Sequence, residues 1–313
     1  MQIIELQDPH HLPQMVDQQY AMAIGFFDGL HKGHQAVIQT AIDEAKALGI
    51  QSAVMTFNPH PSHVLGGGKN KVGYITPYKE KMDVLAALGV DTVFIVKFDE
   101  VLSSLSPEQF VDRFIKGLGV KHVVAGFDFT FGAKGAGTME EMERLADGDY
   151  KTTVVRKVVD AEDKISSTRI RALLAEGKGE EAATLLGRNF TLSGVVVHGA
   201  KDGRKLGFPT ANVMPPAHTI LPLNGVYAVK FTANGKTYDG VCSIGVKPTF
   251  QENHPVLVEV FVLDFDGDLY DQIVEVEWLN FIREEKKFAS VEALIEQMHR
   301  DTEQAKAFLA AAK

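Results

Sequence analysis

The chain has 313 residues, more than one compact core usually holds, so two domains are expected. Its formal net charge of −9 excludes the broad basic surface that proteins use to bind nucleic acid. A single cysteine, Cys242, excludes an intrachain disulfide and is typical of a reducing compartment. The sequence has no apolar run long enough to span a bilayer and no secretory signal at its start, which predicts a soluble cytoplasmic protein.

The first half of the chain alternates strand-like and helix-like segments. Helical spacing runs through Gly33–Leu48, Pro77 opens a second helix after Thr76, and Ser106–Gln109 has the pattern of a capping box. Strand–helix alternation of this kind predicts an α/β domain whose parallel sheet is covered by helices on both faces. The expected strands are Tyr20–Phe27, Ser52–Thr56, Val93–Val96, Val120–Ala125 and Val154–Val159.

The second half is rich in short strands. Asn234-Gly235 lies between two alternating segments and predicts a tight hairpin. Closely spaced strands predict a small antiparallel barrel or sandwich, and a helix capped by Ser290 closes the chain. The boundary is expected near Glu176–Asn189, which gives domains of residues 1–186 and 187–313. The expected strands are Phe190–Val197, Val226–Thr232, Thr237–Ile244, Val256–Phe265 and Ile273–Phe281.

The segment Gly25–His34 carries the clearest chemistry of the first half. It follows the first expected strand and opens the first helix, where unpaired backbone N–H groups favour anions. Gly29 lets a phosphate approach the backbone, and His31 and His34 lie one helical turn apart, as hydrogen-bond donors to phosphate oxygens would. A helix start with two surface histidines is the structural alternative, and the combination of these features makes it the less favoured one.

Three further polar motifs follow later strands or open a later helix. Asn58 follows the second expected strand, Asp128 lies among aromatic residues, and Ser167–Arg169 begins a helix. Each has a purely structural alternative: a turn residue before proline, a loop acid that caps N–H groups, and a helix cap. Their joint placement predicts a nucleotide site at the carboxyl edge of the parallel sheet.

The second half carries two motifs of its own. Gly203–Asn212 combines glycines, Lys205 and a Pro-Thr-Ala-Asn ending, and the Thr210 hydroxyl and Asn212 amide are oxygen ligands that suit Mg²⁺. Glu259 shares a strand face with apolar residues, where a carboxylate needs a partner or a use such as general-base catalysis. The alternatives are an ordinary loop between strands and an exposed barrel face with stray apolar neighbours.

These motifs resemble a known family. Gly25–His34 resembles the His-x-Gly-His signature of nucleotidyltransferases, and Gly203–Asn212 resembles the riboflavin kinase signature. Together they resemble the bacterial bifunctional riboflavin kinase/FAD synthetases over nearly the whole chain. The resemblance implies a Rossmann-like nucleotidyltransferase domain with a parallel sheet, followed by an antiparallel β-barrel of the riboflavin kinase type with a closing helix. It also implies phosphorylation of riboflavin to FMN by ATP, adenylylation of FMN to FAD with release of pyrophosphate, and a requirement for Mg²⁺.

The resemblance also implies a role for each matching residue. Glu259 is the expected kinase base, and His31 and His34 are the catalytic pair of adenylyl transfer. The expected ATP-binding residues of the first domain are Gly25, Phe27, Asp28, Gly29, His31, Gly33, His34, Lys164, Ser167, Thr168 and Arg169, with flavin held by Asn58, Asp128 and Phe129. The expected ATP-binding residues of the kinase are Gly203, Lys205, Gly207, Phe208, Pro209, Thr210 and Asn212, with Thr210 and Asn212 on the metal and Arg283 and Phe288 on the flavin.

Three positions depart from the family pattern, among them Lys134, where many relatives carry Arg or vary. Ser243 stands where the family usually has Asn, and Asp271 follows Tyr270 where the family has Gly, at a turn that needs a positive φ. Two alternatives compete with the bifunctional reading: a single-activity FMN adenylyltransferase with a flavin-binding barrel, and a non-catalytic flavin-responsive binder. In each case the expected partners are small molecules, with no nucleic acid or membrane, and the expected state is a monomer or weak oligomer.

Overall fold

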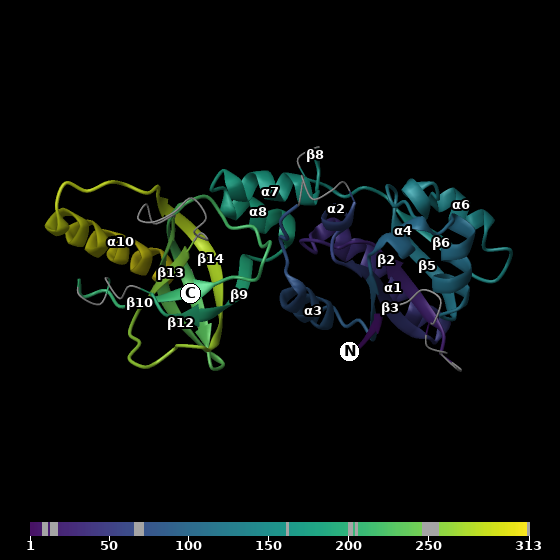
Figure 1. The fold of residues 1–313 in the computed structure, drawn as a ribbon, viewed down its shortest axis with the longest axis horizontal. Helices are drawn as coiled ribbons and strands as arrows, with labels where there is room; N and C mark the ends of the chain where they lie inside the picture. The colour runs from purple at the N-terminus through teal and green to yellow at the C-terminus, as the bar shows by residue number, and fades with distance from the viewer. Residues whose placement is uncertain are drawn as a thin grey trace. The chain divides into compact units, whose positions relative to one another are not determined.

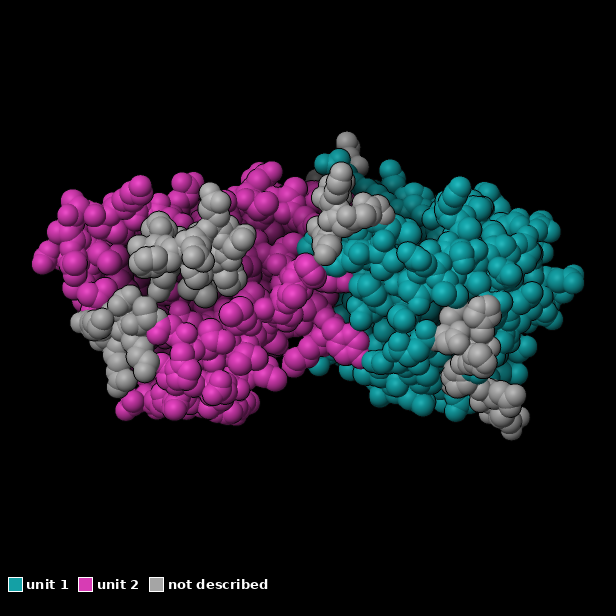
Figure 2. All heavy atoms as spheres, viewed as in Figure 1, with its two compact units in different colours: residues 1–73, 81–166 teal, residues 74–80, 167–313 magenta. Residues whose placement is uncertain are grey.

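The computed structural model describes residues 1–7, 12, 18–65, 72–160, 163–199, 203, 206–245 and 257–311. The chain forms two compact units (Figure 2). Unit 1 comprises residues 1–73 and 81–166, and unit 2 comprises residues 74–80 and 167–313. The functional boundary after residue 186 stays a prediction. Within the described ranges, no helix is both long enough and apolar enough to cross a membrane.

Unit 1 is built on a six-stranded sheet in the order β1-β4-β3-β2-β5-β6, with every neighbouring pair parallel. The parallel sheet predicted from the sequence is therefore confirmed. Figure 1 labels β2, β3, β5 and β6 of this sheet. The edge strand β1 was not predicted, because most of its side chains are exposed and it lacks an apolar run. The strands are β1 (Gln2–Leu6), β2 (Tyr20–Ile24), β3 (Gln51–Asn58), β4 (Thr92–Lys97), β5 (Val120–Gly126) and β6 (Lys151–Val155). The predicted strand Val154–Val159 is instead split between β6 and a two-stranded ribbon of β7 (Val159–Asp160) and β8 (Asp163–Lys164).

Helices cover both faces of this sheet. Alternation along β2 sends Met22 into one hydrophobic cluster and Ala23 into another, and α1 packs on the second face against β2, β3 and β5. The sheet is thus buried on both sides, as parallel sheets require. The helical segments of this part of the chain are α1 (Lys32–Leu48), α2 (Pro61–Val64), α3 (Tyr78–Ala87), α4 (Glu100–Ser104), α5 (Pro107–Phe110), the π-helix η1 (Val111–Lys116), the 3₁₀ helix η2 (Ala133–Gly135) and α6 (Met139–Arg144).

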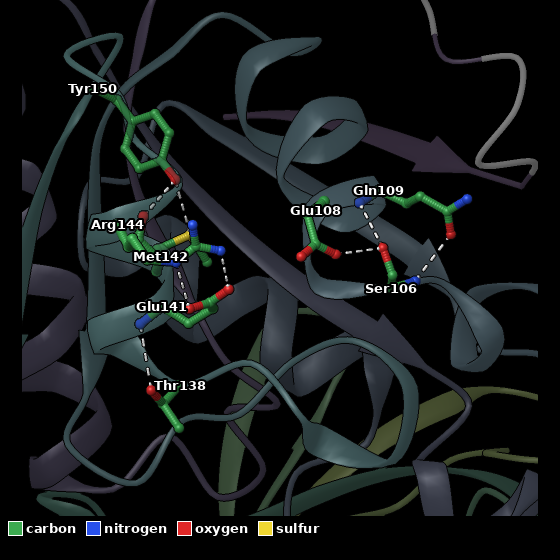
Figure 3. Close-up of polar contacts among 8 residues, drawn as sticks. All are labelled: Ser106, Glu108, Gln109, Thr138, Glu141, Met142, Arg144 and Tyr150. Carbon is green, nitrogen blue, oxygen red and sulfur yellow. Dashed lines mark hydrogen bonds and ion pairs between the residues drawn. The ribbon is translucent and has the colours of Figure 1, made fainter.

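Figure 3 shows two of the side-chain caps at the starts of these helices. The Gln109 backbone N–H donates to the Ser106 hydroxyl at 3.2 Å, and the Ser106 N–H donates to the Gln109 side chain at 3.0 Å. This reciprocal pair is the capping box that the sequence predicted. Thr138 caps α6 with a single hydrogen bond, by accepting from the Glu141 N–H.

Unit 2 is built on a closed antiparallel barrel in the order β10-β13-β12-β11-β14-β9. The Asn234-Gly235 turn has φ values of 51° and 72° and joins β11 directly to β12, which confirms the predicted hairpin. Strand β10 was missed, because the Pro-Thr-Ala-Asn motif read as part of a loop. The strands are β9 (Phe190–Val197), β10 (Thr210–Met214), β11 (Gly225–Ala233), β12 (Lys236–Gly245), β13 (Leu257–Val262) and β14 (Ile273–Arg283).

Among the described residues after 166, three helices accompany the barrel. α7 (Ser167–Ala175) and α8 (Gly179–Leu186) precede the barrel, and α10 (Val291–Ala311) packs on the outer face of β11, β12 and β14 (Figure 1). The Ala293 N–H donates to the Ser290 hydroxyl at 3.2 Å, so the predicted cap of α10 is present. Asp271 has a φ of 61°, the conformation expected of this turn, and aspartate is among the non-glycine residues that adopt it most readily.

Candidate active sites

The sheet of unit 1 places three predicted motifs at one edge. Chain order reverses at β2, which pairs with β3 on one side and with β5 on the other. Open parallel sheets bind ligands at such a switch point, outside the carboxyl ends of the strands. The segment Gly25–His34 follows β2, Asn58 is the last residue of β3, and Asp128 and Phe129 follow β5.

The loop after β2 has an uncommon backbone. Phe27 and Leu30 are both buried and have φ values of 52° and 44°, and Gly29 between them has 86°. Left-handed residues other than glycine cost about 1–3 kcal/mol each, so the surrounding structure must hold them in place. The Gly25 N–H donates to the Met55 carbonyl at 3.1 Å at the start of the loop, and the Gln35 side chain donates to the Leu30 carbonyl at 2.8 Å at its end.

His31 and His34 form a stacked pair at the start of α1. Their ring centroids lie 3.6 Å apart with 19° between the planes. His31 is the N-cap residue, and its Nδ1 accepts from the His34 backbone N–H at 3.2 Å. A neutral imidazole that accepts at Nδ1 carries its proton on Nε2, so His31 keeps an N–H donor for a ligand.

Both imidazoles are neutral near physiological pH. Burial lowers the pKa of His31 to about 4, with a smaller effect in the same direction from Lys164. Burial also lowers the pKa of His34 well below its ordinary value, and the nearby His31, Lys81 and Lys164 lower it further. The Nδ1 atom of His34 is buried and has no hydrogen-bond partner in the part of the chain that the structure describes. The pair therefore offers neutral donors to an anion, not two fixed cations.

Asp128 and Lys164 form an ion pair close to His31. Both side chains are about half exposed, and the Lys164 ammonium lies 4.7 Å from the centroid of the Phe127 ring. Both charges act electrostatically on His31. The half-buried Phe129 packs on the hydrophobic core, stacked with Phe131 at 6.1 Å between ring centroids. The structure thus brings Asp128 and Lys164 near the histidine pair, as the motifs predicted.

The remaining predicted residues of the adenylyl-transfer site lie in α7. Ser167, Thr168 and Arg169 form its first turn, in unit 2, and Thr168 is exposed. Their approach to the ATP phosphates stays a prediction.

Lys81 of α3 is a residue that sequence reasoning missed. Its ammonium is buried and donates to the Phe26 carbonyl at 2.9 Å. The helical spacing around Met82 and Leu85 identified the apolar stripe of α3, and it gave no sign that an adjacent lysine would lie under the loop.

In the barrel, the two groups expected to act on the kinase substrates are direct neighbours. Asn212 on β10 lies opposite Glu259 on β13, and Glu259 lies opposite Ser243 on β12. Val258 and Val260 on either side of Glu259 are fully buried, so strand alternation directs Glu259 to the outer face of the barrel, where it is half-buried. The Asn212 side chain lies against Gly199, and its buried Oδ1 has no hydrogen-bond partner among the described residues.

The predicted phosphate loop before β10 is partly described. The Leu206 and Phe208 N–H groups donate to the Gly203 carbonyl at 3.0 and 2.8 Å. A Cβ at Gly203 would lie 2.4 Å from the Phe208 carbonyl oxygen, so this tight turn requires glycine. Phe208 is buried against Phe261 and His299. Gly207 and Pro209 are exposed, Thr210 is half-buried at the start of β10, and Lys205 lies outside the described residues.

Arg283 and Phe288 contact each other, with the guanidinium 5.7 Å from the ring centroid. The same guanidinium binds Asp301 of α10 through Nε at 2.9 and 3.0 Å and through an NH2 group at 2.7 Å. Gln297 donates to the same carboxylate at 2.8 Å. Arg283 therefore ties β14 to α10, and its contact with flavin stays a prediction.

Comparison with known proteins covers both halves of the chain. A family model described as FAD synthetase matches residues 14–169, and one described as riboflavin kinase matches residues 186–309. Over 310 residues the chain is 46% identical to a bifunctional riboflavin kinase/FMN adenylyltransferase of Listeria monocytogenes, with 99% of each chain covered. A protein of the same name from Bacillus subtilis is 47% identical, with 97% of each covered. This chain belongs to the bifunctional riboflavin kinase/FMN adenylyltransferases. It is accordingly a transferase of FAD biosynthesis, which confirms the function that the motifs predicted.

A solved structure also resembles the chain along its whole length. A crystal structure described as a macrolide-efflux protein from Streptococcus pneumoniae has a TM-score of 0.87 and 33% identity, and it covers 98% of this chain and 99% of that one. Its description as an efflux protein applies to that protein alone. In this chain, the FAD synthetase match covers the strands of the sheet from β2 to β6, and the riboflavin kinase match covers the barrel.

Proposed function

We propose that the barrel holds the riboflavin kinase site, with Glu259 and Asn212 acting on the substrates. We further propose that the edge of the parallel sheet holds the FMN adenylyltransferase site, with His31 and His34 acting on ATP. One observation carries the assignment: the two groups of residues lie in different compact units, and each has the chemistry that one of the two reactions requires. Each reaction needs its own nucleotide, so ATP serves twice, once as phosphoryl donor and once as adenylyl donor.

In the kinase reaction, Glu259 takes the proton of the riboflavin 5′-hydroxyl. The oxygen then attacks the γ-phosphorus of ATP, its P–O bond forms as the bond to ADP breaks, and FMN results. The half-buried position of Glu259 on the barrel face leaves the carboxylate within reach of a substrate. Asn212 lies directly opposite Glu259 on the neighbouring strand, on the side where the 5′-hydroxyl would react.

The residues around Asn212 also fit Mg²⁺. The orphaned Asn212 Oδ1 and the Thr210 hydroxyl on the same strand are hard oxygen donors, and Mg²⁺ commonly takes one or two protein oxygens together with substrate phosphates. We assign Thr210 and Asn212 to this role. When bound, the ion would neutralise charge that develops on the phosphates.

In the adenylyl-transfer reaction, an FMN phosphate oxygen attacks the α-phosphorus of ATP and pyrophosphate leaves, without a covalent enzyme intermediate. Catalysis then depends on positioning and on hydrogen bonds to the phosphate oxygens. The Nε2–H of neutral His31 is such a donor, since Nδ1 accepts from the backbone. Lys164 supplies positive charge beside the pair, and Asn58, Asp128 and Phe129 are assigned to the flavin.

A product assay tests the assignment. Full-length protein is incubated with riboflavin, ATP and Mg²⁺, and the flavins are separated. FMN and FAD together support two active sites. FAD formed only when FMN is supplied supports a single-activity adenylyltransferase whose barrel binds flavin, and bound flavin without turnover supports a non-catalytic binder. Either of these last two outcomes contradicts the proposal.

A further inference from the structure

A buried lysine lies directly beneath the loop that carries the histidine pair. Lys81 is only 6% exposed, and its neighbours on α3, Met82 and Leu85, belong to the hydrophobic core of unit 1. Its ammonium donates to the Phe26 carbonyl at 2.9 Å and lies 4.8 Å from the centroid of the Phe26 ring. Lysine is almost never fully buried without a specific partner, so its place under this loop calls for a reason.

The Phe26 carbonyl is held from two sides. The Thr56 hydroxyl of β3 donates to it at 2.9 Å, and the Lys81 ammonium of α3 lies 3.4 Å from that same hydroxyl. Two donors from separate elements thus fix one carbonyl, immediately before the left-handed residue Phe27. Backbone in that conformation persists where the surroundings over-determine it, and these two hydrogen bonds supply part of that constraint.

Lys81 also contributes charge to the site. Burial lowers its pKa to about 8, while Asp28 in the loop acts in the opposite direction. Of the titratable groups around it, Asp28 belongs to the loop and His34 to α1, and Lys81 lowers the pKa of His34. β3 presents the Thr56 hydroxyl. Near neutral pH, Lys81 is therefore a cation near two neutral imidazoles, which bind the ATP phosphates in the proposed function.

We propose that Lys81 is a positioning residue of the adenylyl-transfer site, which holds the Phe26 carbonyl so that the loop presents His31 and His34 to the ATP phosphates. The inference rests on the proposed function of the histidine pair. Lys81 acts through the loop, since its ammonium is occupied by the Phe26 carbonyl and is covered by the core.

Three full-length variants test this role. Lys81→Met removes the charge and the donor at similar volume, Lys81→Arg keeps both, and Lys79→Met makes the matched change at an exposed position of the same helix. Because a loop displaced by an ångström can cost about 100-fold in rate, Lys81→Met should lower kcat/KM for ATP in adenylyl transfer by about 10- to 100-fold. Lys81→Arg should recover most of this loss, and Lys79→Met should match the wild type. Riboflavin kinase activity in the same preparation should stay unchanged and reports on folding.

The pH profile separates positioning from a merely structural role. In the wild type, kcat/KM for ATP in adenylyl transfer should fall as pH rises through about 8, because the deprotonated Lys81 amine loses its charge and donates a weaker hydrogen bond to the Phe26 carbonyl. The arginine variant should lack this alkaline decline, because its guanidinium stays protonated. The kinase reaction should not share it.

Several outcomes would overturn the role of Lys81. Equal rates of adenylyl transfer in Lys81→Met and Lys79→Met would do so. A wild-type pH profile without the alkaline decline would also do so, and this measurement does not depend on any variant folding. His31→Ala serves as the reference: if it leaves adenylyl transfer intact, the proposed function itself fails. If His31→Ala abolishes adenylyl transfer while Lys81→Met does not, only the positioning role is wrong.

Discussion

Asn212 and Glu259 lie directly opposite each other on neighbouring strands of the barrel. One side chain offers a buried amide oxygen without a partner in the described part of the chain, and the other offers a carboxylate on the same outer face. Asn212 and Glu259 are 47 residues apart in sequence. Their pairing places the residue proposed to hold the metal-bound phosphate next to the residue proposed to take the proton of the substrate hydroxyl. The kinase predictions depend on this pairing.

Asn212→Ala should lower riboflavin kinase activity by about 10- to 100-fold, the usual effect of losing a group that orients a metal-bound substrate. The reason is that the substitution removes the Asn212 Oδ1 atom, which is the proposed Mg²⁺ ligand beside Glu259. The loss should shrink as the Mg²⁺ concentration rises, whereas FAD formation from supplied FMN should not change. Initial rates of FMN formation across a Mg²⁺ titration measure this. Asn280→Ala, on β14, is the control, and a comparable Mg²⁺-dependent loss there would contradict the role given to Asn212.

His31 should make the stability of unit 1 sensitive to acid. Its pKa is about 4 in the folded chain and ordinary in the unfolded chain, so the unfolded state binds more protons between these values. The stabilisation is therefore fully present above about pH 6.5 and is lost as pH falls toward 4. At about pH 5, the free energy of unfolding should have dropped by about 2 kcal/mol from this cause.

Urea unfolding of the wild type and of His31→Asn at about pH 7 and about pH 5 tests this linkage. The variant should lose less stability than the wild type on acidification. His218→Asn, at an exposed position, should lose as much as the wild type. A decline in His31→Asn as steep as that of the wild type would show that His31 is not the group responsible.

Asp301→Ala should destabilise the barrel by about 3 kcal/mol, because it leaves the largely buried Arg283 guanidinium without its bidentate partner. The change removes the tie between β14 and α10. Thermal unfolding of unit 2 measures the effect, and Glu296→Ala, an exposed position of the same helix, should shift stability by less than about 0.5 kcal/mol. Equal effects of the two substitutions would argue against a structural tie at Arg283.

Features that depend on neighbouring residues were predictable from sequence. The Ser106–Gln109 capping box, the Asn234-Gly235 hairpin and the Ser290 cap all form as expected, because their hydrogen bonds join residues a few positions apart. The predicted motifs after β2, β3 and β5 meet at one edge for a related reason, since a parallel sheet brings the carboxyl ends of its strands together.

Features that depend on distant partners were not predictable. The Thr210–Met214 segment pairs with β9 and β13 to form a strand, whereas the residues just before it carry the glycines and the proline of a loop, so the whole motif resembled a loop in the sequence. Lys81 reads as a polar residue beside an apolar helical stripe, and its burial comes from the loop after β2 and from β3. The partner of Arg283 lies on another element, so the sequence pattern around Arg283 could not reveal Asp301.

The most direct test of two independent sites compares Glu259→Gln and His31→Ala in the full-length chain, with FMN formation and FAD formation measured on each preparation. Loss of the general base should lower FMN formation by about 100-fold or more while FAD formation from supplied FMN continues. Loss of the imidazole should do the reverse. If either substitution abolished both reactions in a protein whose unfolding transition is unchanged, the division of the two reactions between barrel and sheet would be wrong.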